Sequence, residues 1–296
     1  MGLRANPTQR QRRLGAELRR LRESSGMSAA EAGSFADLGQ AHMSHIETGR
    51  TAIPEAKLRA LTTAYGCMDE PLVDALVAMG QASGKGWWLD FRESLDASAI
   101  DLAELEATAS AHRTFQWVYV PGLLQTPEYM YALMRAGEPD ASPAELDRGV
   151  EFRQRRQAVL VGDSPPIYHA VIHEAALLMQ FVGAEVMRRQ IEHLVEMARH
   201  PHVRIQILPF AAPAYPARFG TPFVFFESSV PALGTVYVEH PVSSPFLADQ
   251  EHLTQFAEAL DRLGTVALPP LEPQPESKFY AKKDSLGLVQ HLLYIL

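Results

Sequence analysis

Six polar side chains stand beside apolar segments that a folded core should bury. They are Glu106, Gln125, Arg153, Arg156, Glu174 and Glu239. A ligand site combines an apolar lining with a few placed polar groups, so these residues could converge on a ligand- or partner-binding pocket. The alternative is internal pairing of arginine with glutamate, because charged residues are seldom buried unless they are paired. The sequence leaves both interpretations open.

The residue pattern gives little support to metal binding or catalysis. Glu106, Glu174 and Glu239 could in principle hold a metal ion, and His169 and His173 are four residues apart. His169 falls in a β-rich segment, however, where this spacing is not that of a helical face. The sequence also lacks the signatures of zinc proteases, serine hydrolases and cysteine proteases. We therefore expect a protein that is not an enzyme and that has no cofactor and no metal.

Length and charge indicate two folded units with different surroundings. The chain has 296 residues, of which 47% are apolar and 21% charged, and this length exceeds that of a typical single domain. Up to residue 66 it carries ten Arg and Lys against six Asp and Glu, a net charge of +4. The remainder has seventeen against twenty-nine, a net charge of −12. The sequence thus predicts a basic head, the kind of unit that binds phosphates, on an acidic body.

The cysteine content and the apolar runs indicate the compartment. Cys67 is the only cysteine, which excludes an internal disulfide framework. No apolar run approaches the roughly 18 residues of a membrane span, and the first residues do not resemble a signal peptide. We expect a cytoplasmic protein with no membrane partner.

The head is predicted to form four short helices, at residues 9–24, 28–36, 40–48 and 54–65. Ser28 and Glu31 have the spacing of a capping box, which predicts the start of the second helix. In the third helix Met43 and Ile46 should be buried, so its polar residues should point outward. Two short helices joined by a tight turn form a helix-turn-helix, whose second helix enters the major groove of DNA.

Residues 9–66 resemble the xenobiotic-response-element (XRE) family of lambda-repressor-like DNA-binding domains. The resemblance rests on the spacing of Met27-Ser28, Glu31, Gln40, Ser44, Ile46-Glu47, Gly49-Arg50 and Pro54. It implies binding to double-stranded DNA, with base-reading positions at Gln40, Ala41, His42 and His45. It also implies phosphate contacts near Ser44 and Arg50, with further non-specific phosphate contacts from Arg12, Arg13 and Arg19. Ala29 and Gly39 depart from the family pattern, which leaves a protein-binding head as the alternative.

A linker should join the head to the body. Residues 69–83 form a helical pattern with a broad apolar face, which could be a dimer seam or could pack on its own domain. The glycines at residues 80–86 lack the spacing of a phosphate-binding loop and are interpreted as a hinge. The linker and hinge together occupy residues 67–86.

The body, residues 87–268, alternates helical patterns with short β-rich segments. Strands are predicted at residues 115–120, 167–172, 203–208, 222–227 and 235–240. Helices are predicted at residues 98–111, 127–136, 142–161, 174–181, 184–199 and 245–263. The chain is therefore expected to be α-rich, with an all-α helix-turn-helix domain followed by an α+β domain, a small mixed sheet with packed helices.

Residues 88–265 resemble the C-terminal domain of WhiJ-like or antitoxin-like actinomycete regulators. The run Pro121-Gly122-Leu-Leu-Gln125-Thr126 is the most distinctive part, and it is joined by residues 105–107, 153–157, 173–177 and 236–239. The resemblance implies a repressor whose body contacts a small cognate partner protein or senses a small-molecule effector. An antitoxin-like protein that mainly sequesters its partner is the alternative.

The tail, residues 269–296, begins with a proline-rich linker and ends in an amphipathic helix. This helix should dock on the body, on a partner or on a second copy of the chain. Taken together, the sequence predicts a homodimeric regulator that reads two half-sites about one helical turn of DNA apart (~34 Å) and is gated by its body.

Overall fold

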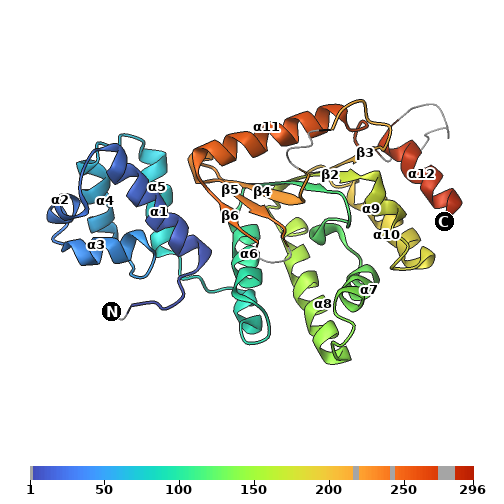
Figure 1. Ribbon diagram of the computed structural model, residues 1–296, viewed down its shortest axis with the longest axis horizontal. Helices are drawn as coiled ribbons and strands as arrows, with labels where there is room; N and C mark the ends of the chain where they lie inside the picture. Colours follow the sequence, from blue (N-terminus) through green and yellow to red (C-terminus); the bar gives the residue numbers. More distant parts are fainter. Residues whose placement is uncertain (1–2, 216–219, 241–243, 273–283) are drawn as a thin grey trace. The chain divides into compact units, whose positions relative to one another are not determined.

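The computed structural model describes residues 3–215, 220–240, 244–272 and 284–296 (Figure 1). The chain divides into two compact units, residues 1–105 and residues 106–296, and each is described by itself. Within the described ranges, no helix combines the length and the apolar character needed to cross a membrane.

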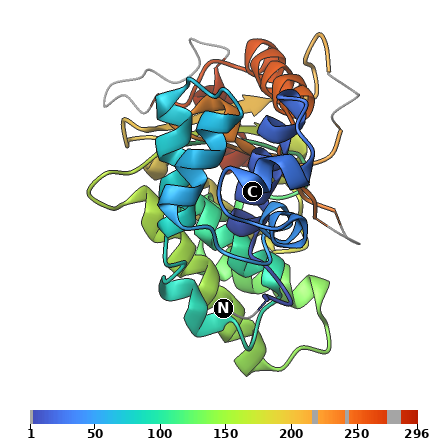
Figure 2. The same ribbon diagram turned by 90° about the vertical axis from the view of Figure 1, so that its left-hand side faces the viewer.

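Unit 1 is built from helices. They are α1 (Gln9–Ser24), α2 (Ala29–Ser34), α3 (Gln40–Glu47), α4 (Glu55–Ala64), α5 (Glu70–Gln81), the 3-10 helix η1 (Trp87–Phe91) and the first turns of α6 (Ala97–Thr108). Figure 2 shows α1 to α5, in blue to cyan, packed as one bundle. Thr8, Ser28 and Asp69 each accept a hydrogen bond from a backbone N–H of the first turn, which fixes the starts of α1, α2 and α5. The four helices predicted for the head are confirmed, with ends that differ by at most two residues.

The apolar face of α5 is used inside unit 1. Its buried residues are Leu72, Val73, Leu76 and Val77. α5 packs against α1 and α4, and a Cβ placed on Gly80 would lie 3.5 Å from a methyl group of Leu14. Of the two interpretations of this helix, the structure thus supports packing within its own domain. The predicted domain end at residue 66 accordingly falls inside unit 1.

Unit 2 contains a mixed six-stranded sheet with strand order β3-β2-β1-β4-β5-β6. The strands are β1 (Ala111–Gln116), β2 (Ile167–His173), β3 (Val203–Leu208), β4 (Phe223–Glu227), β5 (Thr235–Val238) and β6 (Phe246–Leu247). β1, β2 and β3 are parallel, whereas β4 runs antiparallel to β1, and β5 and β6 continue in antiparallel order. The predicted mixed sheet with packed helices is confirmed.

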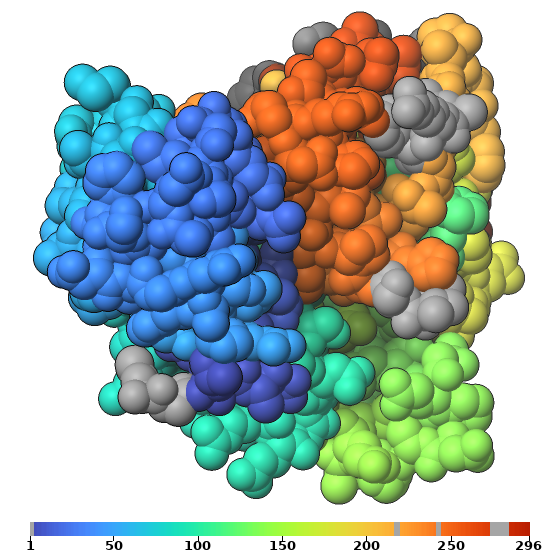
Figure 3. Space-filling view, turned by 60° about the vertical axis from the view of Figure 1, so that its left-hand side comes forward, coloured from blue at the N-terminus to red at the C-terminus, as the bar shows by residue number. Residues whose placement is uncertain are grey.

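Helices cover both faces of the sheet. They are α7 (Pro127–Gly137), α8 (Pro143–Gln157), α9 (Glu174–Leu178), α10 (Ala184–Met197), α11 (Gln250–Val266) and α12 (Ser285–Ile295), with the 3-10 helices η2 (Gly122–Leu124), η3 (Ala158–Leu160) and η5 (Pro231–Leu233). Side chains alternate between the faces, so Val171 packs with Phe115 and Phe256 under α11, while Ala170 and Ile172 pack under α10. Figure 1 shows α11 on one side of the sheet and α7 to α10 on the other, and Figure 3 shows the exposed side of α11 in orange.

Two strands differ from the sequence prediction. β1 begins at Ala111 and ends at Gln116, whereas the prediction placed this strand at residues 115–120. The prediction was wrong because His112 and Thr114 are polar, yet both are buried, and each forms a side-chain hydrogen bond with a backbone carbonyl oxygen. β6 was assigned to the start of a helix, but its two residues pair with β5, and the helix begins at Gln250.

The end of the predicted body and the tail together complete the edge of the sheet. The backbone N–H of Leu268 donates to the carbonyl oxygen of Ile207 at 2.9 Å, and that of Leu271 donates to the carbonyl oxygen of Ile205 at 2.8 Å. The N–H of Ile207 donates to Ser285 Oγ at 2.9 Å. The outer edge of β3 is therefore covered by the chain itself.

The C-terminal helix packs on unit 2. Val289 and Leu292 of α12 are buried, and α12 contacts α10 and β3. Nη1 of Arg188 in α10 donates to the carbonyl oxygen of Leu293 at 2.9 Å. Of the expected positions for this helix, docking on the body is confirmed. Residues 273–283, which include the last three residues of the predicted linker 269–275, lie outside the described residues.

Candidate nucleic-acid interface and the polar cluster of unit 2

The turn between α2 and α3 leaves no room for larger side chains. A Cβ on Gly33 would come within 2.2 Å of the carbonyl oxygen of Leu38, so only glycine fits there. Asp37 has a φ of 50°, in the left-handed region, and Nζ of Lys57 donates to its carbonyl oxygen at 3.2 Å. This turn holds α2 and α3 together as a helix-turn-helix.

α3 presents a polar face to solvent. Met43 is 0% exposed and Ile46 is 2% exposed, and both belong to the core of unit 1. The exposed residues of α3 are Gln40, Ala41, His42 and Ser44, and His45 is half-buried. The side chains of Gln40, His42 and His45 form no hydrogen bond or ion pair with the described residues. The predicted inward and outward positions are thus confirmed, while base reading by these residues stays a prediction.

Two contacts fix α3 against α1. Nε and Nη2 of Arg22 donate to the carboxylate of Glu47 at 2.6 and 3.0 Å, a bidentate pair with both side chains largely buried. Gly15 faces the end of α3, where an added Cβ would lie 2.5 Å from the carbonyl oxygen of Glu47. The close approach of the two backbones therefore depends on glycine at this position.

Arg50 and the first turn of α3 are open to solvent. Arg50 is exposed, and its side chain forms no ion pair with the described residues. Gly39 caps α3 without a side-chain hydrogen bond, so the first N–H groups of the helix lack an internal side-chain acceptor. Arg50, Ser44 and the first N–H groups of α3 can therefore contact a phosphate without breaking a side-chain contact to another described residue.

Of the three arginines of α1 that were predicted to contact phosphates, Arg13 is buried and the other two are paired at the surface. Arg13 is 5% exposed and pairs with Glu17 at 3.1 Å, so it does not reach the surface as a phosphate contact must. Nη2 of Arg12 pairs with Asp101 at 2.8 Å, and Arg19 pairs with Glu23 at 2.7 Å. Burial is the main reason that the pKa of Asp101 is raised, and Arg12 opposes this shift.

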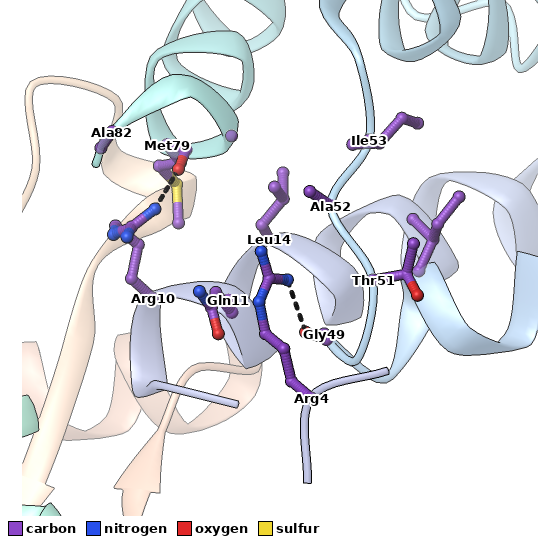
Figure 4. A pocket seen from close by; sticks show the side chains of 12 residues that line it. Arg4, Arg10, Gln11, Leu14, Gly49, Thr51, Ala52, Ile53, Met79 and Ala82 are labelled. Atoms are coloured by element: carbon purple, nitrogen blue, oxygen red, sulfur yellow. Dashed lines mark hydrogen bonds between the residues drawn. The ribbon is translucent and has the colours of Figure 1, made fainter. Parts of the chain in front are cut away.

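Two further arginines hold the unit together. Figure 4 shows Arg4 donating to the carbonyl oxygen of Gly49, at 3.2 Å, and Arg10 donating to that of Met79. Arg10 also pairs with Glu104 at 2.7 Å. Several of the basic side chains of the head are thus already engaged in internal contacts.

A further residue that sequence reasoning missed is Phe35, which is 56% exposed at the end of α2. Its only signal in the sequence is an aromatic residue placed in a turn.

In unit 2 the distinctive Pro-Gly-Leu-Leu-Gln-Thr run forms η2 and the start of α7. Nε2 of Gln125 donates to the carbonyl oxygen of Val120 at 2.7 Å, and Nη1 of Arg153 donates to Gln125 Oε1 at 2.9 Å. Thr126 caps α7, and its backbone N–H donates to Gln190 Oε1 at 2.7 Å. The run therefore joins α7, α8 and α10 and fixes the position of Arg153.

Arg156 and Glu106 form a bidentate ion pair. Nε and Nη2 of Arg156 donate to the two carboxylate oxygens of Glu106 at 2.7 and 2.6 Å, with the side chains 14% and 5% exposed. The backbone carbonyl oxygen of Glu106 lies 3.0 Å from Nε2 of His112, so Nε2 carries the proton when this ring is neutral. Burial lowers the pKa of His112, which favours the neutral ring. The predicted internal pairing is confirmed for Arg156 and Glu106.

Glu239, just after β5, joins the same group on the same face of the sheet. Gln116 and Tyr237 lie on one face by register, and Nε2 of Gln116 donates to Glu239 Oε1 at 3.1 Å. Burial raises the pKa of Glu239, while Gln116, Arg156 and Arg153 oppose the shift. Burial, and next the guanidinium of Arg156, lower the pKa of Arg153.

These residues form what we name the polar cluster of unit 2. Its members are Glu106, His112, Gln116, Gln125, Arg153, Arg156 and Glu239. Five of the six side chains that the sequence singled out are thus brought together. His112 and Gln116 were missed, because polar residues inside a strand gave no signal of burial. Nδ1 of His112 is buried without a hydrogen bond among the described residues.

Glu174 is not part of the cluster. It begins α9, and its carboxylate accepts a hydrogen bond from the backbone N–H of Phe210 at 2.8 Å. The prediction that grouped it with the other five was wrong, because the end of β2 carries it toward β3. His173 caps α9, and His169 binds Gln206 at 2.8 Å. Among the residues that the structure describes, no three His, Cys, Asp or Glu side chains are placed to hold a metal ion.

Comparisons with known proteins agree with this division of the chain. Residues 13–76 match the family described as a helix-turn-helix domain, and residues 99–273 match the family described as a domain of unknown function (DUF5753). The first match contains α2 and α3, which supports DNA binding, and the second contains the polar cluster. No curated protein and no solved structure matches this chain.

Proposed function

This chain belongs to the family of the domain of unknown function DUF5753 and carries a helix-turn-helix domain, and we propose that it is a sequence-specific DNA-binding regulator of transcription. The outward face of α3 is the observation that carries the proposal. Its polar side chains have no partners within the described residues, while Met43 and Ile46 fix the opposite face in the core.

In this proposal α3 enters the major groove. Gln40 can pair with adenine through two hydrogen bonds, and His42 and His45 can bond to base edges, while Ala41 suits the methyl group of thymine. Ser44 and Arg50 contact phosphates, which orient the helix without reading sequence. Arg12 and Arg19 are exposed but paired with carboxylates, so their contacts to phosphates would compete with these ion pairs.

Unit 2 is proposed to gate this activity by binding an effector at the polar cluster. A ligand that binds one state of the protein more tightly shifts the equilibrium toward that state, and DNA affinity changes accordingly. We further infer a cytoplasmic homodimer that reads two half-sites and has no catalytic step. A dimer is supported by the small size of the α3 surface, since one helix reads only a few base pairs.

Exchange of Gln40 and His45 for alanine tests the proposal. The double variant should lose discrimination between operator and scrambled duplex, at about 1 to 3 kcal/mol for each lost base contact. Salt-dependent non-specific binding should remain, because phosphate contacts are kept. Mobility shifts with DNA from upstream of the gene, at low and moderate salt, measure both properties.

The matched control is Gln154→Ala in α8, where the glutamine is exposed and forms no hydrogen bond with described residues. It should bind like the wild type. If the α3 double variant also keeps the full preference for operator, α3 is not the reading helix and the proposal fails.

A second candidate function is the sequestration of a small protein partner, with DNA binding serving autoregulation. The observation that favours it is a group of exposed aromatic residues in unit 2. Trp117, Tyr119 and Phe181 are 41%, 40% and 41% exposed, and the rings of Tyr119 and Phe181 are 5.9 Å apart. A partner that co-purifies in fixed ratio at high salt, and that Tyr119→Ala releases, would favour this function over gating by an effector.

A further inference from the structure

Two opposite charges in the polar cluster form no ion pair with any residue that the structure describes. Arg153 donates to the neutral amide of Gln125, and Glu239 accepts from the neutral amide of Gln116. Neither side chain forms an ion pair with a described residue, although the two are close enough to interact electrostatically. Internal pairing, which accounts for Arg156 and Glu106, therefore does not account for these two residues.

Arg156 and Glu106, in the same polar cluster, form a complete bidentate ion pair. Both carboxylate oxygens of Glu106 are used by one guanidinium, at 2.7 and 2.6 Å. Arg153 and Glu239 instead keep most of their bonding capacity. A guanidinium has five N–H donors and a carboxylate has about four acceptor positions, of which one each is used here by an amide.

The two amides position the charges without neutralising them. Gln125 is 3% exposed and is anchored by its bond to the carbonyl oxygen of Val120, and Gln116 is 3% exposed in β1. Both charged side chains are half-buried rather than fully enclosed. Burial nevertheless disfavours their charged forms, as the raised pKa of Glu239 shows, so a ligand of complementary charge would offset an existing cost.

We propose that the polar cluster binds a small amino-acid-like zwitterion, whose carboxylate meets Arg153 and whose ammonium group meets Glu239. A guanidinium matches a carboxylate in a two-point, planar contact, and a carboxylate is the usual partner of an ammonium group in a partly buried site. The ligand would complete two ion pairs at charges that now contact only neutral amides among the described residues. This inference names the effector class and rests on the proposed gating by unit 2.

The full-length protein should be titrated with each proteinogenic L-amino acid, using thermal shift first and calorimetry for any that stabilise it. At least one should bind. Its amide, which lacks the carboxylate, and its N-acetyl form, which lacks the ammonium group, should each bind about tenfold more weakly or worse, because each loses a charge-assisted contact. This comparison uses the wild-type chain and does not depend on how any variant folds.

Variants then assign the contacts. Arg153→Gln and Glu239→Gln should each weaken binding about tenfold or more, and Arg153→Gln should no longer distinguish the amino acid from its amide. Matched controls are Arg155→Gln, exposed on the same helix, and Glu258→Gln, exposed on α11, which should bind like the wild type. Near-UV circular dichroism verifies that each variant is folded.

The inference is overturned if no amino acid binds the wild type, if the amide and N-acetyl forms bind as well as the parent, or if folded Arg153 and Glu239 variants bind unchanged. Mobility shifts with and without the ligand separate this test from the proposed function. Binding of an amino acid with no effect on DNA affinity would support the ligand class and refute gating. Loss of operator recognition in the α3 variant, with ligand binding intact, would support the reading helix independently.

Discussion

The outward face of α3 and the polar cluster of unit 2 are both groups of polar side chains, but the chain assembles them in opposite ways. The outward face of α3 comes from within one eight-residue helix, and its side chains have no partners among the described residues. The cluster draws on α6, β1, η2, α8 and the end of β5, and its members are bonded to one another. Polar side chains on a surface are hydrated until they bind a partner, so they need no internal hydrogen bonds. Charged side chains inside a fold must instead be bonded to amides or to opposite charges.

The largest effect should follow from removing one half of the bidentate ion pair in the polar cluster. Glu106→Gln leaves the guanidinium of Arg156 largely buried without a charged partner, which should cost about 3 to 5 kcal/mol of unfolding free energy. Urea denaturation measures this loss. The control is Glu151→Gln, whose partner Arg148 is exposed, and which should change stability very little. Equal effects of the two substitutions would mean that the pair in the cluster behaves as a surface pair.

A smaller effect should follow from crowding the support of α3. Gly15→Ala places a Cβ 2.5 Å from the carbonyl oxygen of Glu47, well inside van der Waals contact, and we expect a loss of about 1 to 3 kcal/mol of unfolding free energy with weaker operator binding. Gly137→Ala, at a glycine with no neighbour within 4 Å, is the matched control and should be nearly neutral. Thermal unfolding combined with mobility shifts measures both quantities. If Gly15→Ala retained wild-type stability and affinity, α3 would not depend on this close approach.

The smallest effect concerns the open charges of the cluster. A carboxyl group whose pKa is raised on folding binds its proton more tightly in the folded state. The stability that Glu239 contributes is therefore present below its unfolded pKa and is lost as pH rises through the higher folded pKa. Glu239→Gln should accordingly raise the melting temperature slightly at neutral pH, and this gain should shrink as pH falls toward the ordinary range of glutamate. A pH series by calorimetry, with Glu258→Gln as the control, would contradict this if the gain grew on acidification.

The sequence predicted unit 1 more fully than unit 2, because the signals in unit 1 are local. Apolar spacing and the capping box at Ser28 act within one or two helical turns, and they predicted both the helices and the outward residues of α3. Arg13 was the exception. Its partner Glu17 lies four residues later on the same helix. This spacing already indicated the ion pair, but the prediction did not take it into account.

In unit 2 the decisive contacts join residues far apart in the chain. Five cluster residues were recognised as polar groups beside apolar segments, yet which of them pair depends on strand order. Gln116 meets Glu239 only because β4 lies between β1 and β5. Glu174 was grouped with them by composition, and only the parallel pairing of β2 with β3 shows that it bonds to Phe210 instead.

The covered edge of β3 bears on how molecules of this protein behave toward one another. An open edge strand offers unpaired N–H and C=O groups to any extended segment of another chain, and this is a common start of aggregation. Here Leu268, Leu271 and Ser285 already occupy those groups. The tail therefore protects this edge of the sheet, and a chain cut before residue 268 should aggregate, because it exposes both the edge of β3 and the apolar surface that α12 covers.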